Sequence, residues 1–283
     1  MEWLKNISQA INYIESNLTD DISYDEAAKI ACCSTYYFQR MFSYIAGITL
    51  SEYIRRRRMT AAAFELQRGD MKVMDIALKY GYKSPTAFNR AFQSVHGVSP
   101  VVARTNGTQL SSYPPISFSI LVTEGENMNY RIEKKEAIRI VGVRTALKED
   151  MDENQKIVPI FWNKVLQNEL FSNISKLIEK DSDGIFGVTA YENPKDIYYY
   201  IAVPTNKPIP KGMVEFEIPA ATWVIFESNG RFKESVQTIF KRFLTEWLPF
   251  SGYEYAQLPD IEIYPVIDQK SKCGHVEVWI AVK

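Results

Sequence analysis

Two stretches of the chain, fifty residues apart, carry almost the same short sequence: STYYFQRMFSYIAG at 34–47 and SPTAFNRAFQSVHG at 84–97. When residues 23–47 are aligned with residues 73–97, eight positions are identical. A repeat at a fixed period indicates a supersecondary unit that is used more than once. This repeat constrains the fold of the N-terminal third more than any other feature of the sequence.

Each copy of the repeat is predicted to be a short helix, a tight connection and a longer helix. Ser34 and Ser84 stand where the longer helix begins, because a serine hydroxyl can accept a hydrogen bond from a free amide in the first turn. Gly47 and Gly97 stand at the matching C-terminal ends, where glycine favours the left-handed cap. The repeat therefore has the same start and stop signals in both copies.

The longer helices are predicted to be amphipathic, with apolar residues at positions i, i+3, i+4 and i+7 that pack inward. These apolar residues are Phe38, Met41, Phe42 and Ile45 in the first copy, and Phe88, Ala91, Phe92 and Val95 in the second. The opposite face carries Tyr36, Gln39, Arg40 and Ser43, and then Thr86, Asn89, Arg90 and Gln93. Two helices with a tight turn and a polar outer face are typical of a helix-turn-helix unit, whose second helix enters the major groove of DNA. Arg, Gln and Asn side chains suit the edges of guanine and adenine there.

Residues 50–69 lie between the copies and are predicted to form one long helix. About 18 helical residues span roughly 27 Å, which approaches the ~34 Å between successive major grooves on one side of B-DNA. Residues 34–104 contain 11 Lys and Arg against 4 Asp and Glu, a balance that suits a polyanion. We therefore expect one chain to read two adjacent grooves, although an α-solenoid is also built from repeated helical pairs.

Residues 3–104 resemble the DNA-binding domain of AraC/XylS-type transcriptional regulators. The resemblance rests on five motifs: F-Q-R-M-F (38–42), Y-I-R-R-R-R-M (53–59), I-A-L-K-Y-G-Y (76–82), F-N-R-A-F (88–92) and G-V-S-P-V-V-A-R (97–104). It implies that base edges are read by Tyr36, Gln39 and Arg40, and then by Pro85, Thr86, Asn89 and Arg90. Pro85 has no amide hydrogen to donate, so shape or methyl contact is expected there. Ala103 departs from the family pattern, which usually has an aromatic residue at that position.

The second part of the chain has a different pattern. Residues 108–128 are rich in Ser, Thr, Asn, Gly and paired Pro, and are predicted to link a DNA-binding domain at 1–107 to a second domain at 129–283. The second domain repeats weakly, each half reading as a strand, a helix and two strands. We therefore expect a multidomain chain, with an all-α tandem helix-turn-helix domain followed by an α+β domain of two β-α-β-β units. The helices of that domain are expected to cover one face of its sheet.

The last predicted strand, H-V-E-V-W-I-A-V at 275–282, places Glu277 and Trp279 on the face opposite its valines. Alignment on the shared I-A-V makes Tyr198 and Tyr200 their equivalents in the first unit. We expect this face to form a cleft, because a carboxylate among aromatic rings suits an amphipathic organic cation. Further candidates for its lining are Tyr264, Tyr191 and Trp162. The alternative is that Glu277 only pairs with a Lys or Arg across the sheet.

Residues 130–283 resemble the GyrI-like effector-binding domain. The resemblance rests on W-L-P-F-S-G-Y-E (247–254), P-D-I-E-I-Y (259–264) and V-E-V-W-I-A-V (276–282). It implies that the glutamate of the last strand, here Glu277, lies in a ligand pocket. Because some relatives in that family are thought to be small-molecule hydrolases, a hydrolytic C-terminal domain stays open as an alternative, as does a module that binds and sequesters a protein.

Composition narrows the class of protein. The three cysteines form no even framework and the two histidines no cluster, so we expect neither a disulfide scaffold, nor a metal, nor a cofactor. No signal peptide or membrane-length apolar run is present, which favours a cytoplasmic protein without a membrane partner. We expect a one-component transcription regulator rather than an enzyme. Its expected partners are double-stranded promoter DNA, a small-molecule effector and, as a further candidate, RNA polymerase.

Overall fold

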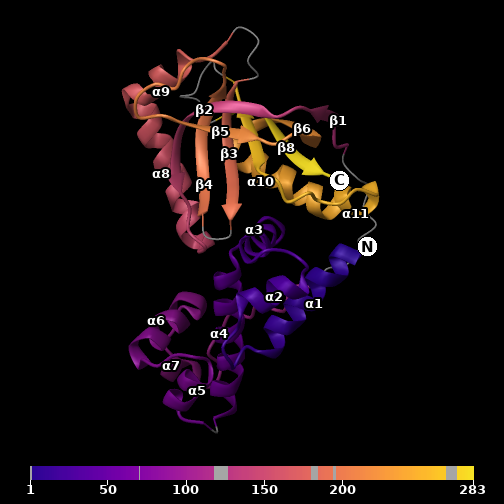
Figure 1. Ribbon diagram of the computed structural model, residues 1–283. Helices are drawn as coiled ribbons and strands as arrows, with labels where there is room; N and C mark the ends of the chain where they lie inside the picture. The colour runs from indigo at the N-terminus through magenta and orange to yellow at the C-terminus, as the bar shows by residue number, and fades with distance from the viewer. Residues whose placement is uncertain (1, 70, 118–126, 180–183, 194–195, 266–272) are drawn as a thin grey trace. The chain divides into compact units, whose positions relative to one another are not determined.

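The computed structural model describes residues 2–69, 71–117, 127–179, 184–193, 196–265 and 273–283. The chain divides into two compact units, residues 1–121 and 122–283, and each is described by itself (Figure 1). Among the described residues, no helix has both the length and the apolar character needed to cross a lipid bilayer.

Unit 1 is all-helical, as predicted. Its helices are α1 (Glu2–Ser16), α2 (Tyr24–Ile30), α3 (Thr35–Ala46), α4 (Leu50–Arg68), α5 (Val73–Lys79), α6 (Pro85–His96) and α7 (Pro100–Ala103). The two copies of the sequence repeat are α2–α3 and α5–α6, and Figure 1 shows the long helix α4 between them.

The ends of the two longer helices confirm the predicted caps. The Ser34 hydroxyl accepts a hydrogen bond from the Tyr37 amide at 3.3 Å, and the Ser84 hydroxyl accepts one from the Ala87 amide at 3.4 Å. Both helices end at a glycine in the left-handed region, with φ of 71° at position 47 and 76° at position 97. The apolar stripe of α6 is buried against α4, in one cluster with Met59, Ala62, Leu66, Phe88 and Phe92.

Unit 2 is α+β, as predicted. Its elements are β1 (Tyr130–Lys135), β2 (Ile138–Ala146), α8 (Met151–Gln167), α9 (Glu169–Ser175), β3 (Ile185–Asn193), β4 (Asp196–Pro204), β5 (Val214–Ile218), β6 (Ala221–Arg231), α10 (Phe232–Arg242), the π-helix η1 (Phe243–Trp247), α11 (Leu248–Ser251), β7 (Asp260–Tyr264) and β8 (Cys273–Val282). Among the described residues the strands form one eight-stranded antiparallel sheet, in the order β1-β6-β8-β7-β3-β4-β2-β5.

The sheet is built from the two predicted β-α-β-β units, each preceded by one extra strand. The first β-α-β-β unit is β2, α8–α9, β3 and β4, and the second β-α-β-β unit is β6, α10, β7 and β8. The extra strands cross over, because β1 pairs with β6 of the second unit and β5 pairs with β2 of the first. At the centre β3 pairs with β7, which matches Val188 with Ile261 and places Tyr200 and Trp279 in symmetric positions on either side.

The two faces of the sheet have different covers. Helix α10 packs against β6 and β8, and Trp162 of α8 contacts Tyr199 and Tyr264 on the same face. We call this face the helix-covered face. The opposite face, which we call the inner face, holds a buried apolar cluster that includes Phe186, Tyr200, Trp223 and Trp279.

Candidate DNA-reading helices and effector site

The outer face of α6 has the properties that base reading requires. Pro85, Thr86, Asn89 and Arg90 are all exposed, whereas Phe88 between them is buried. The side chains of Asn89 and Arg90 make no hydrogen bond or ion pair with another of the described residues. Both side chains are therefore available to the edges of bases, for which their amide and guanidinium groups are suited.

The outer face of α3 carries the predicted residues Tyr36, Gln39, Arg40 and Ser43 along the helix Thr35–Ala46. The Arg40 guanidinium donates to the Tyr44 hydroxyl from Nε at 3.2 Å and from Nη2 at 3.1 Å. Reading of a base by Arg40 therefore requires its guanidinium to exchange these hydrogen bonds for hydrogen bonds to the base.

The four arginines of α4, at positions 55–58, all make contacts within unit 1. Arg55 and Arg56 pair with one glutamate a turn earlier on the same helix. Arg57 and Arg58 reach the first helix and the loop that follows it. Their partners are the carboxylates of Glu52 and Glu15 and the backbone oxygens of Leu18 and Asp20. The run is therefore used for structure, which sequence alone did not show.

Glu277 lies on the inner face and has an ionic partner. Its Oε1 accepts a hydrogen bond from Arg131 Nη2 at 2.8 Å, and its Oε2 accepts one from Trp279 Nε1 at 2.8 Å. Arg131 also pairs with Glu133 and Glu227. The cross-sheet ion pair that the sequence left open as an alternative is therefore present.

The aromatic residues predicted beside Glu277 form a closed core rather than an open cleft. Trp279 and Tyr200 each expose only 1% of their surface. The Trp279 ring lies 5.9 Å from that of Phe186 and 6.3 Å from that of Trp223, between centroids. The strand pattern predicted that these residues share a face, and the side chains of the strands themselves fill the space over it.

Cations of the chain itself already occupy the aromatic rings of the inner face. Lys135 Nζ lies 4.5 Å from the centroid of Trp279. The Arg144 guanidinium carbon lies 3.9 Å from the centroid of Tyr198, and its Nη1 donates to the Tyr200 hydroxyl at 2.9 Å. Lysine and arginine side chains of the chain itself therefore make cation–π contacts with these rings.

A second acid–aromatic cluster lies on the helix-covered face. Glu262 Oε2 accepts hydrogen bonds from the Tyr199 hydroxyl at 3.0 Å and from the Tyr264 hydroxyl at 2.7 Å. Trp162 Nε1 donates to the Tyr199 hydroxyl at 3.0 Å, and its ring meets that of Tyr264 edge to face at 5.3 Å. We call these four residues the Glu262 cluster. Trp162 and Tyr264 were predicted from the sequence, whereas Glu262 and Tyr199 were missed.

Gly187 makes the Glu262 cluster possible. A Cβ at this position would lie 2.3 Å from the Tyr199 hydroxyl oxygen and 3.2 Å from Glu262 Oε2. Any larger residue at position 187 would therefore push the Tyr199 phenol away from the Glu262 carboxylate. The P-D-I-E-I-Y motif contains Glu262, and the alternation of that strand could have placed it on the face opposite the isoleucines.

Tyr191 belongs to a neighbouring contact. Its hydroxyl donates to Asp260 Oδ2 at 3.1 Å, and the Tyr255 hydroxyl donates to Oδ1 of the same carboxylate at 2.8 Å. Asp260 is buried, with 2% of its surface exposed. The seven predicted ligand residues are therefore divided between two faces of one sheet, and they do not converge on a single site.

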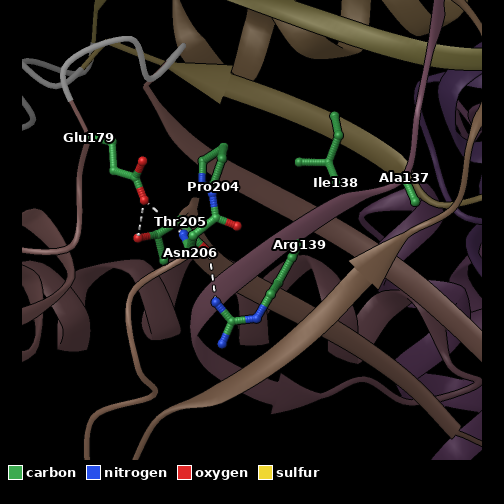
Figure 2. A pocket seen from close by; sticks show the side chains of 7 residues that line it. All are labelled: Ala137, Ile138, Arg139, Glu179, Pro204, Thr205 and Asn206. Carbon is green, nitrogen blue, oxygen red and sulfur yellow. Dashed lines mark hydrogen bonds between the residues drawn. The ribbon is translucent and has the colours of Figure 1, made fainter.

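A pocket of about 300 Å³ lies elsewhere, where β2 begins and β4 ends (Figure 2). Its lining residues are Ala137, Ile138, Arg139, Glu179, Pro204, Thr205 and Asn206. Glu179 Oε1 accepts from the Thr205 hydroxyl at 3.0 Å and from the Asn206 amide at 2.8 Å, and Arg139 Nη1 donates to the Thr205 carbonyl at 2.7 Å. The pocket contains none of the residues predicted from the sequence. Within the part of the chain that the structure describes, no group of three or more His, Cys, Asp or Glu side chains could hold a metal ion.

Comparison with known proteins supports both halves of this description. The model of the helix-turn-helix domain family matches residues 27–106, and that of the family described as integron-associated effector binding protein (Cass2) matches residues 131–282. The transcriptional activator AarP of Providencia stuartii is 42% identical over 102 residues, which are 36% of this chain and 76% of AarP. The regulatory protein SoxS of Escherichia coli strain K12 is 37% identical over 93 residues, or 33% of this chain and 87% of SoxS.

A solved structure of SAV2435 bound to tetraphenylphosphonium has a TM-score of 0.49 and 21% sequence identity, and covers 55% of this chain and 94% of SAV2435. That likeness is too weak to transfer a ligand from one protein to the other. AarP is named as an HTH-type transcriptional activator and SoxS as a regulatory protein, and neither name describes an enzyme. The chain belongs to the Cass2 family of integron-associated effector binding proteins over residues 131–282, carries an AraC-type helix-turn-helix domain before it, and is an AraC-family transcription regulator with an effector-binding domain.

Proposed function

We propose that this regulator reads promoter DNA with α3 and α6 in adjacent major grooves, and that a small aromatic or cationic effector binds its C-terminal unit. The observation that carries the DNA part is the exposed face of α6, where Asn89 and Arg90 have no partner among the described residues. Arg90 suits the O6 and N7 atoms of guanine, and Asn89 suits the N6 and N7 atoms of adenine. Thr86 and Pro85 offer methyl and shape contacts beside them.

The length of α4 supports the placement in adjacent grooves. Its 19 residues span about 28 Å, and the flanking units add to the ~34 Å that separates successive grooves on one side of the duplex. On the α3 side, base reading falls to Tyr36, Gln39 and Arg40. An effector changes DNA binding only if it binds one arrangement better than another.

For the effector we propose the Glu262 cluster on the helix-covered face. Its carboxylate is held by two phenol groups and stands among the rings of Trp162, Tyr199 and Tyr264. An aromatic cation at this place would gain Coulomb attraction and cation–π contact, worth ~2 kcal/mol when desolvated. On the inner face, the carboxylate of Glu277 pairs with Arg131.

The proposal is tested by comparing Glu262→Gln with Glu277→Gln in the full chain. Tetraphenylphosphonium serves as the cationic probe and triphenylphosphine oxide as a neutral probe of similar shape. We expect Glu262→Gln to weaken binding of the cation about tenfold, equivalent to ~1.4 kcal/mol, and to change binding of the neutral probe much less. Glu277→Gln should leave both affinities nearly unchanged. Isothermal titration calorimetry measures all four.

The outcomes separate the two faces of the sheet. A loss of cation binding in Glu277→Gln alone would move the effector site to the inner face, as the sequence predicted. An equal loss for the cationic and the neutral probe in Glu262→Gln would remove the electrostatic explanation.

A further inference from the structure

After α7 ends at Ala103, the chain stays packed against unit 1. Residues 110–117, which we call the strap, lie against α4. Leu110 and Tyr113 pack on the apolar cluster formed by α4 and the second helix-turn-helix unit. On the α6 side, Nε2 of His96 lies 3.0 Å from the carbonyl oxygen of Met59 in α4. The strap therefore begins beside the second helix-turn-helix unit, α5–α6.

The middle of the strap is bonded to α4 through the backbone and side chain of Tyr113. Its amide donates to the hydroxyl of Thr60 at 3.2 Å, and its carbonyl accepts from Arg57 Nη1 at 2.5 Å. The Arg56 guanidinium carbon lies 4.9 Å from the centroid of the Tyr113 ring. Thr60 is buried, with 1% of its surface exposed, so the strap covers α4 at this place.

The far end of the strap reaches the first helix-turn-helix unit. The Ile116 amide donates to the Tyr53 hydroxyl at 3.2 Å, and that hydroxyl donates to Glu15 Oε1 of α1 at 2.6 Å. Arg57 binds both oxygens of the same carboxylate, from Nε at 3.0 and 3.1 Å and from Nη2 at 2.8 Å. The strap thus runs antiparallel to α4, from Met59 and Thr60 back to Tyr53.

We propose that the strap is a positioning element for DNA binding, which holds the two helix-turn-helix units at one separation and angle along α4. Tyr53, Arg57 and Tyr113 are its positioning residues and need not touch DNA. A single helix, α4, connects the two helix-turn-helix units, and a single helix can bend. When a second chain segment is hydrogen-bonded along such a helix, the helix resists bending. Two of the four arginines of α4, Arg56 and Arg57, contact the strap. This inference rests on the proposed reading of two adjacent grooves.

The test uses the full chain with the double variant Tyr53→Phe/Thr60→Val, which removes the side-chain acceptors of the two strap amides. Tyr80→Phe is the matched control. Tyr80 exposes 3% of its surface, as Tyr53 does, and its hydroxyl donates to Glu65 at 2.7 Å, away from the strap. Two measurements are made: amide hydrogen exchange at Tyr113 and Ile116, and selection of binding sites from duplexes of random sequence.

For the wild type and for Tyr80→Phe we expect two half-sites at one spacing, about 10 base pairs from centre to centre. The double variant should exchange the two strap amides at least tenfold faster and should select half-sites at several spacings, with the sequence of each half-site unchanged. If the double variant does not fold, Tyr113→Ala loosens the same contact without altering the interior of α4, and the same broadening is expected.

Three results would overturn the proposal or its basis. If the strap amides exchange faster but the selected half-sites keep one spacing, the strap does not position the two helix-turn-helix units. Unchanged exchange in the double variant would show that these bonds do not hold the strap. If the wild type itself selects only single half-sites, reading of two grooves is wrong, and the positioning role is excluded with it.

Discussion

Arg40 and Arg90 stand at the same place in the sequence repeat, yet the structure surrounds them differently. Arg40 donates two hydrogen bonds to the Tyr44 hydroxyl, from Nε at 3.2 Å and from Nη2 at 3.1 Å. Arg90 is exposed and has no partner among the described residues. A guanidinium that binds guanine must first give up its internal hydrogen bonds, so Arg90 is better prepared for DNA than Arg40.

We therefore expect Arg90→Ala to cost ~1–3 kcal/mol in affinity for a selected operator and to relax the preference at one base pair. Arg40→Ala should cost less, because part of what Arg40 gains on DNA is offset by the contacts it leaves. Fluorescence anisotropy with the operator and with a random duplex measures both effects. Equal losses on the two duplexes would make Arg90 a phosphate contact, and a larger loss for Arg40→Ala would show that α3 dominates base reading.

At the scale of elements, the C-terminal turn of α6 contains a buried titratable group. His96 exposes 7% of its surface, and its ring lies 4.3 Å from that of Phe92. Its buried Nδ1 has no hydrogen-bond partner among the described residues. Burial lowers the pKa of His96 below its usual value near 6.5, although the hydrogen bond to the backbone of Met59 opposes this shift. The unfolded chain therefore binds a proton at a higher pH than the folded chain does.

Because the pKa of His96 is lower in the folded state than in the unfolded chain, we expect unit 1 to lose stability as the pH falls below about 6.5. The loss continues until the pH reaches the pKa of the folded state. The midpoint of urea unfolding, followed by an optical probe in unit 1, should be lower at pH 5.5 than at pH 7.5. His96→Gln should reduce this difference, whereas His275→Gln is the control, because His275 is exposed and is the other histidine of the two in the chain. The same pH dependence in both variants would contradict the assignment to His96.

At the scale of the whole molecule, unit 2 depends on an exchange of strands between its halves. The extra strand of the first half, β1, pairs with β6, and the extra strand of the second half, β5, pairs with β2. The central contact between β3 and β7 also joins the halves. Each half alone would expose an unpaired strand edge and one side of the buried cluster around Trp223 and Phe186.

We expect separately expressed fragments 129–211 and 212–283 to show no cooperative thermal unfolding, whereas the intact fragment 129–283 unfolds in one transition. Circular dichroism of each fragment, and of the two mixed in equal amounts, makes this measurement. A cooperative transition in either half alone would show that the strand exchange is not required for folding.

Much of this molecule could be predicted because the relevant signals are local. The caps at Ser34 and Ser84 act on amides three residues away, and the stripe that contains Phe88 and Phe92 repeats within one helix. The order of strands and helices within the two β-α-β-β units follows from alternation within short segments, whereas β1 and β5 were not predicted. For the same reason the sequence placed Tyr198, Tyr200, Glu277 and Trp279 together on one face.

The sequence by itself determined the tandem helix-turn-helix unit, the two β-α-β-β units and the residues that share each face, because periodicity and capping act over a few residues along the chain. Only the tertiary structure decided what covers each face. It pairs Glu277 with Arg131, 146 residues away, fills the inner face with aromatic side chains, gathers Tyr199 and Tyr264 around Glu262, and lays the strap along α4. These contacts join segments distant in sequence, and the side-chain pattern of one segment carries no record of the segment that packs against it.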